Sequence, residues 1–87
     1  MAVQVAKIRK GACYSNGEFG KKWCVWQVAE IRVEMNDAEP PLEQDVVHFR
    51  VLVGKNRRKY QSLTRGDFIS KLRYEVELVE STWQRIK

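Results

Sequence analysis

The stretch Trp23–Met35, WCVWQVAEIRVEM, decides the fold of this 87-residue chain. In its second half apolar and charged residues alternate, as in a β-strand with one buried and one solvated face. The apolar side chains of that half are Ala29, Ile31, Val33 and Met35, and the charged ones are Glu30, Arg32 and Glu34. In the first half both faces are apolar. This change along one strand predicts a strongly bent strand of the kind found in small barrels.

Three other segments are predicted to be strands. Val3–Lys10 is rich in β-branched residues and is expected near a sheet edge. Asp45–Val53 alternates, with Val47, Phe49, Val51 and Val53 facing inward and His48 and Arg50 outward. Phe68–Glu80 is expected to place Phe68, Leu72, Tyr74, Val76 and Leu78 on one face, and Lys71, Arg73, Glu75 and Glu77 on the other.

The connecting segments carry turn signals. Gly11–Lys22 holds three glycines and the pair Asn16-Gly17, which favours a loop or a hairpin tip. Asn36–Asp45 has two prolines and four acidic residues, so it is predicted to be an exposed acidic loop. Lys55–Leu63 lacks β-branched residues and is predicted to be a short helix capped by Asn56. Thr64–Asp67 is predicted to be a turn, and the tail Ser81–Lys87 stays open between a frayed end and a partner-binding arm.

These elements predict one domain, residues 1–87, with a mostly β fold. Without long helical crossovers the strands pair mainly antiparallel, and closing the sheet removes its exposed edges. We therefore expect a small antiparallel β-barrel with one short helix. The alternation accounts for four strands. A further strand comes from the glycine-rich loop, from the tail or from a divided long strand; otherwise the fold is another small β-barrel or an open sheet completed by a second subunit. A domain of this size buries little surface, which favours a homodimer or higher oligomer.

The net charge of +5 is unevenly distributed. Residues 1–33 carry +4, residues 34–47 carry −5, residues 48–73 carry +7 and the remainder carries −1. Segregated positive charge attracts polyanions, because phosphate contacts release counterions. The alternative is that the Lys and Arg side chains only keep a small β protein soluble.

Two parts of the chain resemble known single-stranded DNA-binding proteins. VVHFRVLVGKNRRKYQSLTRGDFISKLRYEVEL resembles the strand, helix, Gly-Asp turn and strand unit of the OB-fold members. IRKGACYSNGEFGKKWCVWQVAEI is similar to the start of the small filamentous-phage proteins. The resemblance implies a five-stranded OB-like β-barrel that binds single-stranded DNA in the cytoplasm of a bacterial or phage-infected cell. In agreement, no stretch is long and apolar enough to span a bilayer, and MAVQVAKIRK lacks the apolar core of a secretory signal.

The residues that suit such binding are cations and aromatic rings. Bases stack on aromatic faces while Lys and Arg follow the phosphates. The candidate nucleic-acid-binding residues are Lys21, Lys22, Trp23, Trp26, Arg32, Arg50, Lys55, Arg57, Arg58, Lys59, Tyr60, Lys71 and Arg73. Trp26 is expected on the outward face with Glu30 and Arg32, beside a band of cations from neighbouring strands. The competing interpretation places both tryptophans in the core and the cations on an ordinary solvated surface.

The sequence contains no motif for catalysis, metal binding or cofactor binding. His48 is a lone histidine without a nucleophile placed beside it, so no enzyme activity is expected. Cys13 and Cys24 lack the spacing of a zinc site and are expected to be reduced thiols, Cys24 buried in a strand.

Three functions therefore compete. The first is a single-stranded DNA-binding protein of DNA replication with little sequence preference. The second is a protein-interaction module, such as a phage-encoded inhibitor or assembly factor, in which the acidic loop and exposed aromatics form a protein interface. The third is RNA binding, which the residues do not separate from the first.

Overall fold

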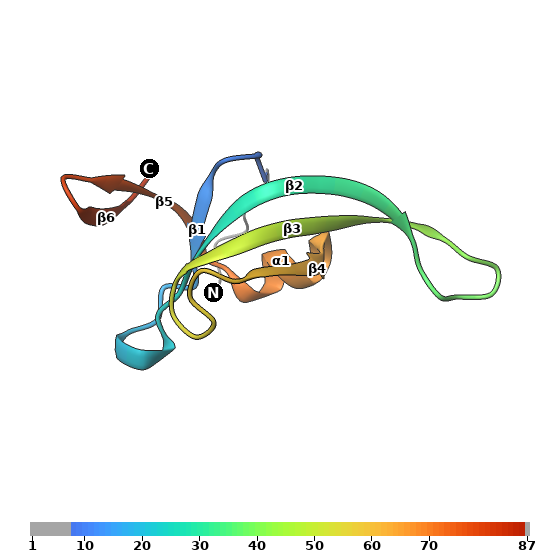
Figure 1. The fold of residues 1–87 in the computed structure, drawn as a ribbon, viewed down its shortest axis with the longest axis horizontal. Helices are drawn as coiled ribbons and strands as arrows, with labels where there is room; N and C mark the ends of the chain where they lie inside the picture. The colour runs from blue at the N-terminus through green and yellow to red at the C-terminus, as the bar shows by residue number, and fades with distance from the viewer. Residues whose placement is uncertain (1–7, 87) are drawn as a thin grey trace.

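One antiparallel sheet and one α-helix form the described part of the chain, residues 8–86 of the computed structural model (Figure 1). Its six strands are β1 (Cys13–Ser15), β2 (Val25–Met35), β3 (Glu43–Val53), β4 (Tyr60–Thr64), β5 (Tyr74–Val79) and β6 (Thr82–Arg85). The helix α1 spans Arg65–Lys71, and a 3-10 turn, η1, spans Gly20–Lys22. The prediction of a mostly β, antiparallel fold with one short helix is confirmed.

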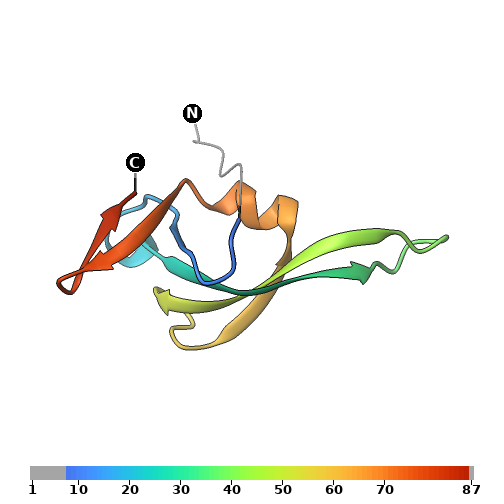
Figure 2. The ribbon, with the colours of Figure 1, turned by 90° about the horizontal axis from the view of Figure 1, so that it is seen from above.

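The predicted closed five-stranded barrel is wrong. The strands form an open six-stranded sheet in the order β4-β3-β2-β1-β5-β6, so β4 and β6 are its edges. The glycine-rich segment contributes β1, the tail contributes β6, and β4 lies in the segment that was predicted to be a helix. The sheet does not close on itself. Instead, α1 lies against one face of the β2–β3 ribbon (Figure 2). We call this helix-covered side of the sheet the inner face.

The long β2–β3 hairpin contains a β-bulge at Ala29. Val28 lies opposite Phe49 and Glu30 lies opposite His48, so Ala29 has no partner of its own across the ladder. An extra residue in one strand reverses the side on which the following residues point. The alternation of β2 therefore changes phase at this residue.

Trp26 consequently lies on the inner face, and its predicted place beside Glu30 and Arg32 is wrong. It is opposite Val51, whose side chain is buried in the core. Beyond the bulge Ile31 shares the inner face, while Glu30 and Arg32 point to the other side, which we call the outer face. The period-two pattern was correct within each half of the strand and failed only across the bulge.

The core lies between the inner face and α1. Its buried members are Tyr14, Val28, Val47, Phe49, Val51, Phe68 and Leu72. Phe68 contacts the rings of Tyr14 and Phe49 at centroid distances of 6.0 and 5.3 Å. Leu72 follows Phe68 by four residues, the spacing that places two side chains on one side of a helix. These two residues anchor α1 to the sheet.

The predicted helix and the predicted last strand were both misplaced. Residues 55–58 form a turn, and the following β4 pairs with β3 from Arg50↔Tyr60 to Val46↔Thr64. The helix begins instead where a turn was predicted, with the Thr64 hydroxyl accepting a hydrogen bond from the Asp67 N–H at 3.3 Å. This is an N-cap, and Asp67 in the first turn suits the helix dipole. Only Tyr74–Val79 of the predicted strand Phe68–Glu80 is a strand.

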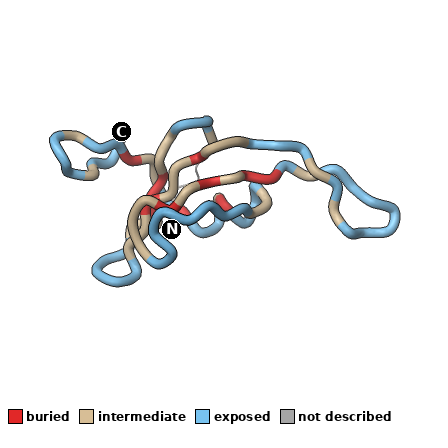
Figure 3. Tube along the Cα trace, in the orientation of Figure 1, coloured by how far each residue is buried: buried red, intermediate tan, exposed pale blue. Residues whose placement is uncertain are grey.

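The half of the β2–β3 hairpin next to its connecting loop extends beyond the rest of the sheet. We call the segment 31–45 the arm. It ends in the acidic loop at residues 36–42, and this connecting segment is exposed, as predicted (Figure 3). β4 pairs with β3 only up to Val46, and β1 pairs with β2 only at Val25–Gln27. The arm is therefore a two-stranded ribbon in the part of the chain that the structure describes.

Two sequence predictions concern the chain's first segment and Cys24. Residues 8–10 are not in a strand, and residues 3–7 of the predicted strand Val3–Lys10 lie outside the described residues. Cys24 comes just before β2 and is half-buried, so its predicted burial within a strand is wrong. Both Cys13 and Cys24 are free thiols. No helix in residues 8–86 is long and apolar enough to cross a membrane.

Candidate nucleic-acid interface

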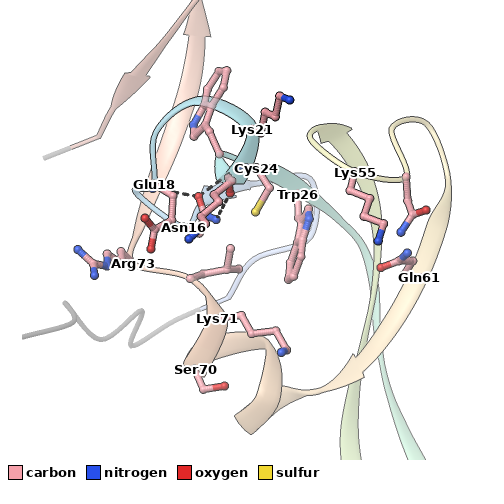
Figure 4. A pocket seen from close by; sticks show the side chains of 14 residues that line it. Asn16, Glu18, Lys21, Cys24, Trp26, Lys55, Gln61, Ser70, Lys71 and Arg73 are labelled. Carbon is pink, nitrogen blue, oxygen red and sulfur yellow. Dashed lines mark hydrogen bonds between the residues drawn. The ribbon is translucent and has the colours of Figure 1, made fainter.

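A cavity of about 610 Å³ opens between the β1–β2 loop, the β3–β4 turn and the end of α1 (Figure 4). Its walls come from the β1–β2 loop, the start of β2, the β3–β4 turn, β4, and the segment from the end of α1 to β5. The lining residues are Asn16, Glu18, Lys21, Lys22, Trp23, Cys24, Trp26, Lys55, Asn56, Gln61, Ser70, Lys71, Leu72 and Arg73. We call this cavity the basic pocket. It gathers seven of the predicted binding residues from segments far apart in the sequence.

Trp26 lies in the middle of the basic pocket. One side of its ring stacks on Phe49, with centroids 4.5 Å apart and an interplanar angle of 23°. Phe68 supports it further at 5.8 Å. The ring is half-buried, and Figure 4 shows it between Lys71 and Lys55. A ring held from behind by the core keeps its orientation before any ligand arrives, so little side-chain entropy is lost on binding.

Hydrogen bonds to Asn16 shape the β1–β2 loop. Its side-chain amide donates to the Lys22 carbonyl at 2.7 Å, and its carbonyl oxygen accepts from the N–H groups of Glu18 and Cys24 at 3.1 Å each. Ser15 Oγ accepts from the indole N–H of Trp23 at 3.2 Å. These bonds hold Lys21, Lys22 and Trp23 at the rim of the pocket.

Gly54 allows the β3–β4 turn to approach the start of β2. Its φ is +109°, and a Cβ atom there would lie 2.9 Å from the Trp23 carbonyl oxygen and 3.0 Å from Cys24 Cβ. A side chain at this position would therefore push the two segments apart. The close approach brings Lys55 to the pocket wall opposite Lys71 (Figure 4).

Positive charge dominates the basic pocket. Five cations line it, namely Lys21, Lys22, Lys55, Lys71 and Arg73, against one carboxylate, Glu18. None of the five forms an ion pair with another residue in the range 8–86. Five like charges beside a single carboxylate repel one another, so an anion in the pocket relieves that repulsion.

Arg32, Arg50 and Tyr60 lie on the outer face. They do not join the pocket. The predicted outward band of cations, which united Arg32 and Arg50 with Lys71 and Arg73, is wrong, because α1 and the segment after it carry Lys71 and Arg73 to the inner face. Arg32 is paired with Glu30 at 2.7 Å. Arg50 lies 5.9 Å from the centroid of the Tyr60 ring, which is 70% exposed. The Nε atom of Arg50 is buried, with no hydrogen-bond partner among the described residues.

The remaining predicted cations, Arg57, Arg58 and Lys59, lie on the exposed β3–β4 turn. The Arg58 N–H donates to the Val51 carbonyl at 2.7 Å, and its φ of +71° is in the left-handed region that a long side chain seldom adopts. This turn stands between the pocket, which Lys55 enters, and the outer face with Tyr60.

Phe19 is an aromatic residue that the sequence reasoning did not include in the site. It follows Glu18 in the β1–β2 loop, directly before η1, and it is 90% exposed. Its neighbours Lys21 and Lys22 are pocket cations. The signal was present in EFGKK, since a phenylalanine between polar and glycine residues has no strand or helix face to bury it.

Burial changes the acidity of the two thiols. It raises the pKa of Cys24, which lines the pocket, although a hydrogen bond from the Asn16 backbone opposes this shift. Burial, together with the nearby Glu75 carboxylate, also raises the pKa of Cys13. Both remain protonated thiols near neutral pH and are therefore poor nucleophiles. On the outer face the hydrogen bond from Arg32 lowers the pKa of Glu30.

Residues 8–86 contain no group of three or more His, Cys, Asp or Glu side chains that could hold a metal ion. Comparison of the chain with protein-family models, curated proteins and solved structures finds no match.

Proposed function

We propose that this protein binds single-stranded DNA, with little sequence preference, in the basic pocket. The observation that carries the proposal is the position of Trp26, an aromatic ring held by Phe49 in a cavity lined by five cations that have no ion-pair partner among residues 8–86. Stacking recognises the face that every base possesses, and cations recognise the phosphates that every nucleotide carries. Neither contact reads sequence.

In this proposal an unpaired base enters the pocket and stacks against the Trp26 ring. Lys55 and Lys71, on either side of that ring, neutralise phosphates of the same strand. Phe19 and the cations Lys21 and Lys22 extend the path along the β1–β2 loop. A duplex is disfavoured, because its bases are stacked on one another and are not free to leave the helix at low cost. In the cell, the protein would coat single strands exposed during DNA replication.

A fluorescence titration tests the proposal. Tryptophan emission is followed while oligo(dT), a duplex of the same length or single-stranded oligo(U) is added at several salt concentrations. The expected result is quenching by oligo(dT), with an affinity that falls steeply as salt rises, and weaker binding of the duplex. Stronger binding of oligo(U) would identify RNA as the ligand. Absence of quenching and of binding by an independent method such as electrophoretic mobility shift would overturn nucleic-acid binding altogether.

A further inference from the structure

In the part of the chain that the structure describes, the arm has one unpaired strand edge and an exposed apolar stripe. Within residues 8–86, no strand pairs with β2 along Ile31–Met35 on the side away from β3. On the inner face of this segment Val33 is 63% exposed and Met35 58% exposed, and Ile31 is partly exposed beside them. A two-stranded ribbon with a bare apolar face is marginally stable in water, and its free backbone groups are a template for another strand.

We propose that a second copy of this chain pairs with the arm, β2 against β2, antiparallel around a two-fold axis at Val33. The segment Ile31–Met35, IRVEM, is self-complementary in this register. Val33 lies opposite Val33 of the second copy. Ile31 lies opposite Met35 of the second copy and Arg32 opposite its Glu34, and the two-fold axis generates each of these two pairs twice. Apolar and oppositely charged cross-strand pairs stabilise antiparallel sheets.

The registers centred nearer to the bulge, at Arg32 or at Ile31, are less favourable. An axis at Arg32 opposes arginine to arginine and Glu30 to Glu34, and like charges directly opposed are destabilising. An axis at Ile31 carries the second strand alongside Val28. That edge is already occupied, because Gly11 donates to the Val28 carbonyl at 2.8 Å and the Val28 N–H donates to the Ala12 carbonyl at 2.9 Å. The register at Val33 avoids both problems.

Charge complementarity also identifies a second copy as the partner. In this register the acidic loop of one copy, residues 36–42, runs past Ala29 toward residues 9–11 of the other. Lys10 belongs to that segment and is close enough to Glu30 to help lower its pKa. The two acidic loops point to opposite ends of the pair, so they do not repel each other. A two-fold axis perpendicular to the sheet leaves both inner faces, and both basic pockets, on one side of the dimer.

Disulfide trapping tests the register. The full-length chain carrying Cys13→Ser and Cys24→Ser is given one new cysteine, at Val33 or at Ile31, and is mildly oxidised. We expect Val33→Cys to form a covalent dimer, because directly opposed residues have their Cα atoms within disulfide range. Ile31→Cys should stay monomeric, and the double variant Ile31→Cys/Met35→Cys should crosslink. Equal crosslinking of the two single variants would overturn the register at Val33.

A charge exchange tests the pairing without cysteines. Sedimentation analysis over a concentration series should show a dimer for the unmodified chain. Arg32→Glu or Glu34→Arg should each weaken it at least about tenfold, because each opposes two like-charged pairs. The double variant Arg32→Glu/Glu34→Arg should restore the dimer. Glu77→Lys, a reversal of an exposed charge on β5, is the control and should change nothing. A monomeric unmodified chain at all concentrations, or no restoration by the double variant, would overturn the proposal; circular dichroism verifies folding.

Discussion

The indole of Trp26 stacks on the ring of Phe49 at a centroid distance of 4.5 Å, and the same indole lines the basic pocket. One residue thus belongs to both the core and the candidate site. The two interpretations of Trp26 that the sequence left open, a core residue and a stacking platform, are compatible, since a ring has two faces.

The first prediction identifies the fluorescent reporter of binding. Trp26→Phe keeps an aromatic ring against the core and removes the Trp26 indole from the pocket, while the Trp23 indole stays at its rim. If Trp26 carries the base contact, this variant loses most of the quenching caused by oligo(dT). The control is Trp83→Phe in β6, which lies outside the pocket and should quench as the unmodified chain does. The proposed contact is wrong if Trp83→Phe abolishes the quenching and Trp26→Phe retains it.

The second prediction concerns salt dependence. Lys55→Gln/Lys71→Gln removes two pocket cations, and log affinity against log salt should become shallower by about 1.4, since each phosphate contact on a single strand contributes roughly 0.7. The control is Arg9→Gln, whose guanidinium is already paired with Glu75 at 2.6 Å. It should leave the slope unchanged. Equal slopes for all three proteins would show that Lys55 and Lys71 do not contact phosphates.

The third prediction is that a substitution of Phe19 lowers the affinity for oligo(dT) without lowering the stability of the fold. Because the side chain is 90% exposed, Phe19→Ala should change the free energy of unfolding by no more than about 0.5 kcal/mol. It should nevertheless weaken oligo(dT) binding about fivefold or more, the lower range for one stacked base. Urea unfolding and the fluorescence titration measure the two effects. Unchanged affinity would remove Phe19 from the interface.

The fourth prediction is an alkaline loss of stability from the half-buried thiols. Burial raises the pKa of Cys13 and Cys24 in the folded state, so the folded protein holds these protons more tightly than the unfolded chain. Stability should therefore fall as the pH rises through the ordinary thiol range and above it. Urea unfolding at pH 7 to 10 should give a flatter profile for Cys13→Ser/Cys24→Ser. Part of the fall should persist, because burial also raises the pKa of Tyr14.

Much of the fold could be predicted from local pattern. The long strand within Trp23–Met35, the strand within Asp45–Val53 and the acidic loop between them follow from alternation and from proline. The pattern failed for Phe68–Leu72, because the four-residue spacing of these two apolar side chains fits a helix, whereas the following Tyr74, Val76 and Leu78 fit a strand. Only the packing of Phe68 against the rings of Tyr14 and Phe49 shows that this part of the segment is a helix and not a strand.

The candidate site was predicted as a set of residues and not as a surface. Seven of the thirteen predicted residues line the basic pocket, while Arg32, Arg50 and Tyr60 lie on the outer face. A single extra residue, Ala29, causes part of this division, because it reverses the direction of Trp26 relative to Arg32. The sequence contains a signal of that bulge, because the apolar positions are even-numbered at Trp26 and Val28 and odd-numbered from Ala29 onward.

The amino-acid sequence by itself determined the antiparallel β character, the acidic segment and the abundance of cations near aromatic rings, since these depend on neighbours along the chain. Tertiary structure alone decided that the sheet stays open, that the helix begins at Arg65, and that Trp26 and Lys71 meet in one cavity. Those outcomes depend on which faces can be buried together, and that choice is made by packing between segments distant in the sequence.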